Sequence, residues 1–451
     1  MADKNDSTYK PVATPVDDYQ LEEGAKVAGK PNSFMQIVIL GFVCFGCPGM
    51  FNAINGLGGG GQVDSTVSSN SNVALYATFA FFSVFSGSIH NYLGPRLTLF
   101  IGGLPYVLYI GSFLNYNHTL NGTFVIVAGG ILGVGAALLW TAQGAMVLSY
   151  PTENEKGKFI STCWIIFNLG GVLGALVPFI LNYNSEAGAV NDGTYIAFLI
   201  IMVCGAALAL FMKNPSSIIR SDNTQVLYPK SASVKEEVLG LYHALFDWRM
   251  LCLIPASFAS NFFYQYQFNG VNGYLFTLRS RSLNGTLYWG MQMLAAFVFG
   301  NYVMDKESLS RQLRGKLGLG IVTFFTFLAW ILGVILQKDY DRDNKHYDRI
   351  DFTDSSRAAF PMIVFLLYGL VDAVYQNYVY WVIGAMSNDP LELARFVGLY
   401  KAFQSAGGAI SWKVDVWGVD YMTQLVVDWV LMAVSFPFMY LVIRKLPNIS
   451  T

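Results

Sequence analysis

FPMIVFLLYGLVDAVYQNYVYWVIG, residues 360–384, is a nearly unbroken apolar stretch in which Asp372 is the one charged residue. A helix of about 20 residues matches the thickness of a bilayer core, so this stretch predicts a membrane-spanning helix. Eleven other stretches share its length and apolar character. The twelve predicted spans lie at about residues 34–56, 72–91, 97–115, 122–148, 157–182, 192–212, 249–269, 284–304, 314–336, 360–384, 394–414 and 421–445.

The composition agrees with an all-α membrane protein. Hydrophobic residues make up 54% of the chain and charged residues only 13%, about half the charge of an ordinary soluble protein. The net charge is -1 and the basic residues are dispersed, so we expect no nucleic-acid partner. The five cysteines fall in or beside apolar spans and form no disulfide or metal pattern.

The polar segments divide the predicted spans six plus six. We expect a disordered cytoplasmic tail at 1–33, a six-helix bundle at 34–212, a cytoplasmic linker at 213–248, a second six-helix bundle at 249–445 and a cytoplasmic tail at 446–451. Two bundles joined by a polar linker are what a transporter needs if its halves are to rock about a central site.

The basic residues indicate the orientation of the chain. An even number of spans puts both termini on one side, and nineteen of the 28 Lys and Arg residues fall on that side, which is therefore expected to be cytoplasmic. Three glycosylation sequons, at Asn117, Asn121 and Asn284, fall on predicted outer loops. The protein is expected in the plasma membrane or an endomembrane.

Asp372 is the candidate functional residue. It lies near the middle of its span, where an acid costs about 2.5 to 3.5 kcal/mol to insert, and it shares a helical face with Tyr375 and Gln376. Lys401 lies at the same depth in the next span, which predicts a charge pair with Asp372. Either Asp372 takes up and releases a proton or contacts a cationic substrate, with Lys401 as its tuning partner, or the two form a permanent structural ion pair. Asp428 is expected near the interface.

Two further features bear on function. Tyr264 and Gln265 in span 249–269 either bind substrate or form bonds between helices, which are worth about 0.6 kcal/mol each. The run GLGGGGQ, residues 56–62, follows a span and not a strand, so it predicts a tight outer loop or an outer gate and not a nucleotide site. With the spans placed in this way, no Ser/His/Asp set, paired catalytic carboxylates or metal-ligand cluster comes together. We therefore expect no enzyme, metal or cofactor.

The segment GSIHNYLGPR, residues 87–96, resembles the loop signature of the major facilitator superfamily, Gly-x-x-x-Asp-x-x-Gly-basic-basic. Asn91 stands at the acidic position and Pro95 at the first basic position. In the family this loop helps to hold the cytoplasmic gate through charge contacts, so the missing acid predicts a weakened contact in this half. The expected gate-loop residues are Gly87, Asn91, Gly94 and Arg96.

Longer stretches resemble the uncoordinated-ninety-three-like (ion-channel regulatory) branch of that superfamily, especially its fungal members. They are GMFNAINGLGGGGQ (49–62), YPTENEKGK (150–158), FNLGG (167–171), YGLVDAVYQ (368–376) and QSAGG (404–408). The resemblance implies twelve helices in two six-helix bundles. It also implies that the first helix of each three-helix repeat lines the cavity, and on these helices lie Asn52, Asn55, Gln143, Tyr264, Gln265 and Asp372.

Two functions follow from these observations. The first is a secondary active transporter that moves a small solute of unknown class across the bilayer by alternating access, with proton coupling as a hypothesis. The second is a regulatory or escort subunit that carries nothing and binds another membrane protein, a channel or a receptor. The residues expected along the substrate or proton pathway are Asp372, Lys401, Tyr375, Gln376, Gln404, Tyr264, Gln265, Asn52, Asn55 and Gln143.

Overall fold

The computed structural model describes residues 32–61, 65–181, 183, 190–226, 234–306, 308–343 and 348–446. The predicted tail at 1–33 lies outside these residues except for its last two, and the predicted tail at 446–451 lies outside them except for its first. Seven residues of the predicted linker, 227–233, also lie outside.

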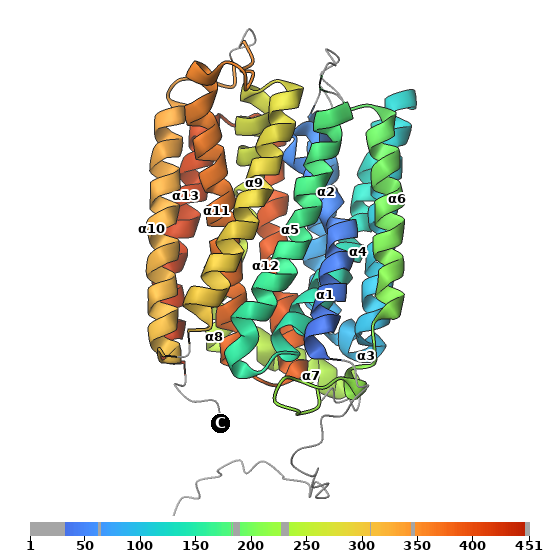
Figure 1. Cartoon of the computed structure of the whole chain (residues 1–451), viewed down its shortest axis with the longest axis vertical. Coiled ribbons are helices and arrows are strands. Elements are labelled where there is room, and N and C mark those ends of the chain that lie inside the picture. The colour runs from blue at the N-terminus through green and yellow to red at the C-terminus, as the bar shows by residue number, and fades with distance from the viewer. Residues whose placement is uncertain are drawn as a thin grey trace, which may run out of the picture. The chain divides into compact units, whose positions relative to one another are not determined.

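The described part is built from helices (Figure 1). Most run along the long axis of the view, and α7 lies across the lower end. The helices are α1 (Ser33–Cys44), α2 (Met50–Gly56), α3 (Thr66–Thr119), α4 (Gly122–Ser149), α5 (Lys156–Leu181), α6 (Asp192–Leu208), α7 (Val234–Leu245), α8 (Trp248–Ala259), α9 (Leu278–Phe299), α10 (Arg311–Gln337), α11 (Ser355–Met386), α12 (Pro390–Val416) and α13 (Tyr421–Ile443). π-Helical turns η1 (Phe45–Gly49), η6 (Tyr266–Gly273) and η7 (Gly300–Met304) join or extend several of them.

Eleven of the twelve predicted spans fall on a helical segment, and α3 carries two of them; the span 249–269 is interrupted by turns. The backbone of α3 breaks at Gly94, where φ is 76° and ψ is 167°, a conformation that costs glycine little and other residues much. In the described part, eight helical segments are long and apolar enough to cross a membrane. α9 and α12 are not among these eight, and the predicted span 249–269 begins with the twelve-residue α8, so the number of spans stays a prediction.

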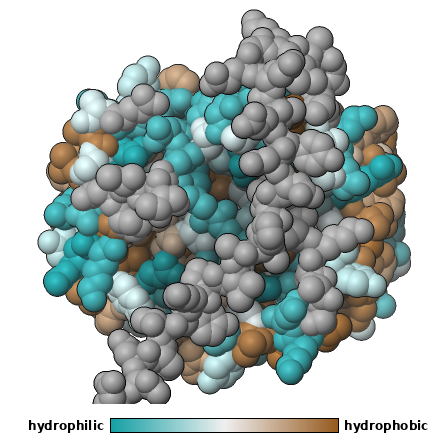
Figure 2. All heavy atoms as spheres, turned by 90° about the horizontal axis from the view of Figure 1, so that it is seen from below, coloured by the Kyte–Doolittle hydropathy of each residue, from teal (hydrophilic) through white to brown (hydrophobic). Residues whose placement is uncertain are grey.

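Large apolar side chains are exposed on the outer faces of the helices. Phe81 on α3 is 63% exposed, Ile200 on α6 is 61% exposed and Phe324 on α10 is 62% exposed. The lower face, seen in Figure 2, instead carries many hydrophilic residues, with hydrophobic ones toward its edge. Apolar flanks and a polar end are the surface that a bilayer and its aqueous boundary require.

The chain between α8 and η6 leaves the regular helix. α8 ends at Ala259, residues 260–263 form turns, and helix resumes at Tyr264 and leads into the wider π-helical turn η6. Such irregular backbone is tolerated at membrane depth only where it is buried in protein or lines a cavity. The break places Asn261 and Tyr264 on the wall of the central cavity.

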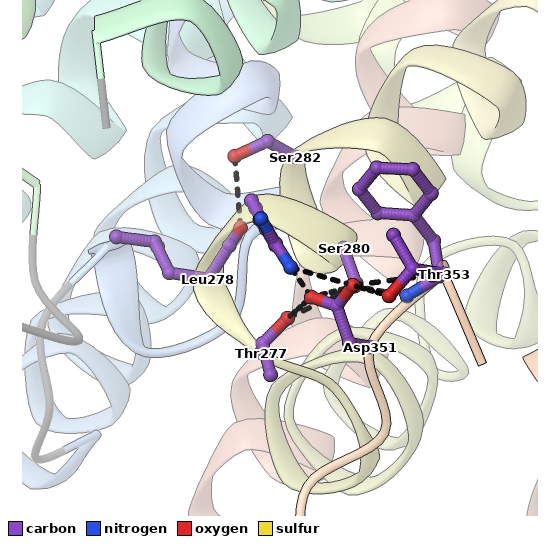
Figure 3. Close-up of polar contacts among 8 residues, drawn as sticks. Thr277, Leu278, Ser280, Ser282, Asp351 and Thr353 are labelled. Carbon is purple, nitrogen blue, oxygen red and sulfur yellow. Dashed lines mark hydrogen bonds and ion pairs between the residues drawn. The ribbon is translucent and has the colours of Figure 1, made fainter. Parts of the chain in front are cut away.

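The start of α9 is fastened by a carboxylate from the loop before α11. Figure 3 shows Thr277, Ser280 and Thr353 gathered around Asp351. The Arg279 guanidinium donates to both Asp351 oxygens, at 2.6 and 2.9 Å, and the Thr353 hydroxyl donates at 2.7 Å. Partial burial acts to raise the pKa of Asp351, but these hydrogen bonds outweigh it and hold the pKa well below its usual range. α9 in turn carries Tyr288 and Gln292, which donate hydrogen bonds to Asp372.

Candidate functional site

Asp372 is sealed inside the protein by hydrogen-bond donors. It is fully buried on α11. One oxygen lies 3.3 Å from the Tyr264 hydroxyl and 2.5 Å from Gln376 Nε2; the other lies 3.0 Å from the Tyr288 hydroxyl and 2.6 Å from Gln292 Nε2. The donors come from the segment after α8, from α9 and from α11 itself. A buried carboxylate with so many donors is compensated for its lost hydration without a neighbouring cation.

Lys401, on α12, has a different environment. Its side chain is 3% exposed, and Nζ donates one hydrogen bond of 2.8 Å, to Gln404 Oε1. The ammonium lies 4.6 Å from the ring centre of Trp140, 5.1 Å from that of Tyr380 and 5.0 Å from that of Tyr400. Aromatic faces attract cations at these distances. Lys401 is therefore held mainly by three rings and one amide.

The predicted charge pair is wrong in its direct form, because no ion pair joins Asp372 and Lys401 among the described residues. Two amides connect them instead. Gln376 donates to Asp372 at 2.5 Å and accepts from Gln404 Nε2 at 2.9 Å, while Gln404 accepts from Lys401 at 2.8 Å. Each amide points its N–H toward the acid and its carbonyl toward the ammonium, so the dipoles align between the charges. We call these four residues the relay.

One end of the relay lines a small central cavity of about 40 Å³. Asp372 does not line it, whereas Lys401, Gln404 and Gln376 do. The helices that follow α7 give this polar wall, with Asn261 and Tyr264; the helices that precede α7 give an aromatic wall with one amide. The residues of the second wall are Phe51, Asn52, Leu75, Tyr76, Phe79, Tyr106, Leu132, Ala136, Trp140, Trp164 and Phe167.

Besides Asp372, four of the predicted pathway residues do not line this cavity. The Tyr375 hydroxyl lies 2.8 Å from Ser435 Oγ on α13. Asn55 donates to the Phe51 carbonyl and accepts from Asn72, so it serves helix packing. Gln143 accepts a 3.1 Å hydrogen bond from the hydroxyl of Tyr380, one of the three rings beside Lys401. Gln265 is buried, and its Nε2 has no hydrogen-bond partner in the described part.

The sequence prediction missed the residues that surround the two charges. Gln292 donates to Asp372 and accepts a 3.0 Å bond from the Trp164 indole of α5, so it ties the acid to the helices before α7. An amide in the middle of an apolar span is a signal that sequence reading can use. Tyr288, Trp140 and Tyr380 give no such signal, because aromatic residues are common throughout these spans.

The gate loop does have an acid nearby, supplied by α7. Asn91 Nδ2 lies 3.5 Å from both carboxylate oxygens of Glu237, and Glu237 forms a 2.9 Å ion pair with Arg395 at the start of α12. The weakened charge contact of the loop itself stays a prediction, and the acid beside Asn91 comes from outside the loop signature. Gly87 lets α3 approach α12, since a Cβ there would lie 2.7 Å from the Ala394 carbonyl oxygen. The remaining loop positions are Gly94, at the break in α3, and Arg96, which is exposed.

Charged groups close the cavity toward the α7 end. Lys156 at the start of α5 donates to Asn388 Oδ1 at 2.7 Å, and Glu153 pairs with Arg311 at 2.5 Å. Asp305 accepts a 2.7 Å bond from the Gly157 N–H across the same boundary. Burial raises the pKa of Asp305 to about 6, against the lowering effect of its backbone donors.

Glycine carbonyls, amides, one arginine and one carboxylate close the opposite end, where the Ser69 hydroxyl donates to Asp415 at 3.1 Å. Gly58 to Gly61 all have positive φ, between 62° and 80°, so the predicted tight loop exists and requires glycine. Arg281 donates to the Gly58 carbonyl at 2.6 Å, and Asn272 donates to the Gly56 carbonyl at 2.8 Å. The cavity is thus closed at both ends by contacts between helices before and after α7.

One expectation about surface position is wrong. Asn284 lies inside α9 and not in a loop; it is 1% exposed and donates to Asn272 Oδ1 at 3.0 Å, so it has no room for a glycan. Asp428 lies in the second turn of α13, is 2% exposed, and its Oδ2 has no hydrogen-bond partner in the described part; its expected depth near the interface stays a prediction. Glycosylation at Asn117, which is partly buried, and at the exposed Asn121 stays a prediction.

Comparison with known proteins places the chain. The sequence model of the family described as "Ion channel regulatory protein UNC-93" matches residues 60–414. The chain belongs to the UNC-93 family. UNC93-like protein 1 of Arabidopsis thaliana is 47% identical over 410 residues, covering 90% of this chain and 89% of the relative. An UNC93-like protein of Schizosaccharomyces pombe is 41% identical over 423 residues, covering 93% and 84%. The family resemblance in the sequence is confirmed.

Solved structures give the fold of this UNC-93 family member. The Escherichia coli fucose:proton symporter FucP superposes with a TM-score of 0.58 over 91% of this chain and 98% of that one, at 14% sequence identity. The predicted fold class, the major facilitator fold of all-α membrane proteins, is confirmed. The protein is an integral, multi-pass membrane protein.

Proposed function

We propose that the protein is a secondary active transporter that moves a small solute by alternating access, coupled to a proton carried by Asp372. The relay carries the proposal, because it joins a buried acid to a lysine on the wall of a closed central cavity. Buried acids in transporters commonly mark proton pathways. The major facilitator fold supports the same function.

Protonation of Asp372 changes what the cavity wall presents. The ionised carboxylate only accepts, and its neighbours all donate to it, whereas the protonated acid must donate one bond itself. The Gln376 amide is then no longer held with its N–H toward Asp372. Its hydrogen bond with Gln404 can change as a result, and so can the bond between Gln404 and Lys401. Tyr264 gives the proton a path, since it lines the cavity and its hydroxyl lies 3.3 Å from Asp372.

Alternating access uses the contacts that close the two ends. Rocking of residues 34–212 against 249–445 breaks one set of contacts while the other set holds. We assign the α7 end and both termini to the cytoplasm, because nineteen of the 28 Lys and Arg residues fall on that side of the predicted topology. The transporter then opens alternately through the charged α7 end and the glycine turn.

The second candidate function is a regulatory or escort subunit. It is favoured by the printed description of the family, which names an ion channel regulatory protein. Such a subunit needs an outward binding surface and has no use for an acid joined to an internal cavity. The relay therefore weighs toward transport.

The test uses purified protein in liposomes that contain a pH-sensitive dye. A panel of solutes is added outside, and the expected result is that one class drives protons across the membrane. Asp372→Asn abolishes this movement, while Asp428→Asn, a second buried acid outside the relay, leaves it intact. Solute flux that ignores the pH gradient and survives Asp372→Asn contradicts proton coupling. Absence of any solute flux, with a membrane protein co-purifying at fixed stoichiometry, contradicts transport and supports the escort.

A further inference from the structure

The cavity wall carries one basic side chain, that of Lys401, and no acidic one. The other polar residues on it are the amides of Asn52, Asn261, Gln376 and Gln404, with the hydroxyls of tyrosines. The carboxylate of the relay is shielded from the cavity behind Tyr264 and Gln376. A solute inside therefore meets a positive site, and a cationic solute meets a like charge in a poorly hydrated space.

Lys401 has capacity for another acceptor. An ammonium has three N–H donors, and one of them is used, on Gln404. The other two directions face aromatic rings and the cavity, with no second acceptor among the described residues. An anionic group that enters the cavity gives Lys401 a charge-assisted hydrogen bond, which is stronger than a bond between neutral groups.

The aromatic wall on the opposite side of the cavity determines what shape and polarity the body of the ligand can have. Seven of its eleven residues are aromatic, among them Trp140, Trp164 and Phe167. A flat apolar body gains stacking and burial there. A polyhydroxylated solute leaves its hydroxyls unpaired on that side, which costs binding free energy for every unpaired group. Asn52 is the one amide on this wall.

We propose that the cavity binds a small organic anion with a flat, apolar body, with its anionic group on Lys401 and its body against the aromatic wall. This inference rests on the transporter function proposed above and gives its solute a chemical class. Because the closed cavity holds only about 40 Å³, such a ligand binds to a form in which the walls have moved apart.

Binding of the anion at Lys401 also changes the protonation of Asp372 through the relay. When the anion accepts a hydrogen bond from one of the unused Lys401 donors, it draws the ammonium toward the cavity and weakens its bond to Gln404 Oε1. Gln404 Nε2 also lies 3.0 Å from Asn261 Oδ1 and 3.2 Å from the Tyr400 hydroxyl, so the amide can shift toward these acceptors, and its bond to Gln376 then weakens. The negative charge brought into the cavity also favours the neutral form of Asp372. Solute and proton therefore enter the same conformational state.

The test compares matched small probes on the full-length purified protein by calorimetry and by tryptophan fluorescence. Benzoate and phenylacetate carry a ring and a negative charge; benzamide carries the ring without the charge, benzylamine carries the opposite charge, and acetate carries the charge without a ring. The two aryl carboxylates are expected to bind about tenfold more tightly than the other three, which is the effect of one charge-assisted hydrogen bond.

Variants assign the binding to Lys401. Lys401→Gln is expected to lower benzoate affinity about tenfold, while Lys401→Arg keeps the preference for carboxylates and shows that the cavity still folds. Lys413→Gln on the same helix, where the side chain lies over Trp417 outside the cavity, is the matched control and leaves affinity unchanged. Thermal unfolding of each variant checks that the protein is intact.

The outcomes separate this inference from the transporter proposal. Equal binding of benzamide, tighter binding of benzylamine, or no binding of either carboxylate at millimolar concentration overturns the anion class. Carboxylate binding without movement across a liposome membrane supports the class and contradicts transport. Proton-coupled movement of a neutral or cationic solute supports transport and overturns the class.

Discussion

Asp372 and Lys401 are joined by one chain of amides, yet their surroundings differ in kind. Asp372 lies behind the cavity wall and accepts hydrogen bonds from four side chains on the segments that follow α7. Lys401 lies on the wall, bonded to one amide and surrounded by rings, one of which, Trp140, comes from α4. The acid has its partners already, and the base has room for another.

The difference assigns a separate task to each charge. A group with fixed donors and no contact with the cavity is suited to hold or release a proton, because only a proton is small enough to reach it. A group with unused donors on the cavity wall is suited to meet a solute. The two amides between them let one event influence the other, which is the requirement for coupled transport.

The largest effect is expected from removing the acid. Asp372→Asn keeps the shape of the side chain and loses the ionisable group, so solute accumulation driven by a pH gradient should fall to the level of empty liposomes. Exchange of solute at equal concentrations should continue, because it needs no net proton movement. Loss of exchange together with accumulation would show that Asp372 binds the solute or holds the fold, and would remove the division of tasks.

A smaller effect is expected from cutting the relay while leaving both charges in place. Gln404→Met and Gln376→Met retain size but cannot transmit a hydrogen bond, so downhill solute flux should persist while the number of protons moved per solute falls. The measurement is simultaneous recording of solute uptake and internal pH in liposomes. Unchanged proton stoichiometry in both variants would mean that the charges communicate without the amides.

The acid at the α7 end is expected to contribute a weaker pH dependence of its own. The pKa of Asp305 is raised to about 6, so the closed form of this end holds its proton more tightly and loses stability as pH rises through that value. Arg314 and Glu155 also act on this carboxyl, in opposite directions. Spin labels at the exposed Lys158 and Lys306 positions should show a larger separated population at pH 7 than at pH 5.

Asp305→Asn is the control for that measurement. The variant should remove the pH dependence of the label distances and leave proton-coupled accumulation in place. If accumulation is lost instead, the proton pathway runs through the α7 end, and Asp372 is not the coupling residue.

The smallest effect is expected at Tyr375, which shares a helical face with Asp372 in the sequence but points toward α13. Tyr375→Phe loses the buried hydrogen bond to Ser435 Oγ and the longer contact, of 3.4 Å, with the Ala256 carbonyl, at a cost of about 1 kcal/mol in the free energy of unfolding. Transport and proton stoichiometry should match those of the unchanged protein. A change in coupling would extend the relay to a residue that the structure places outside it.

The sequence predicts the helices well because the bilayer imposes length and apolarity on each of them, and it points to Asp372 because an acid in a span needs compensation. It fails where rotation about a helix axis matters. Depth along α11 and α12 puts Asp372 and Lys401 at one level, but the side chains face different neighbours. The Asn284 prediction failed because α9 begins at Leu278, six residues before the predicted span.

Contacts between distant segments were also beyond the sequence. The acid that pairs with Arg395 comes from Glu237 in the linker and not from the loop signature at Asn91. The rings around Lys401 come from three different positions, two of them far from Lys401 in the sequence. Both arrangements depend on tertiary packing, and a single sequence carries no pattern that pairs these residues.

Proton uptake on ligand binding tests the link between the two charges most directly. Calorimetry of benzoate binding in buffers of different ionisation enthalpy gives the number of protons taken up with each ligand. The relay predicts net uptake near neutral pH, reduced uptake in Gln404→Met, and no uptake in Asp372→Asn while Asp428→Asn behaves as the unchanged protein. Benzoate binding without proton uptake, or uptake that persists in Asp372→Asn, would contradict the account.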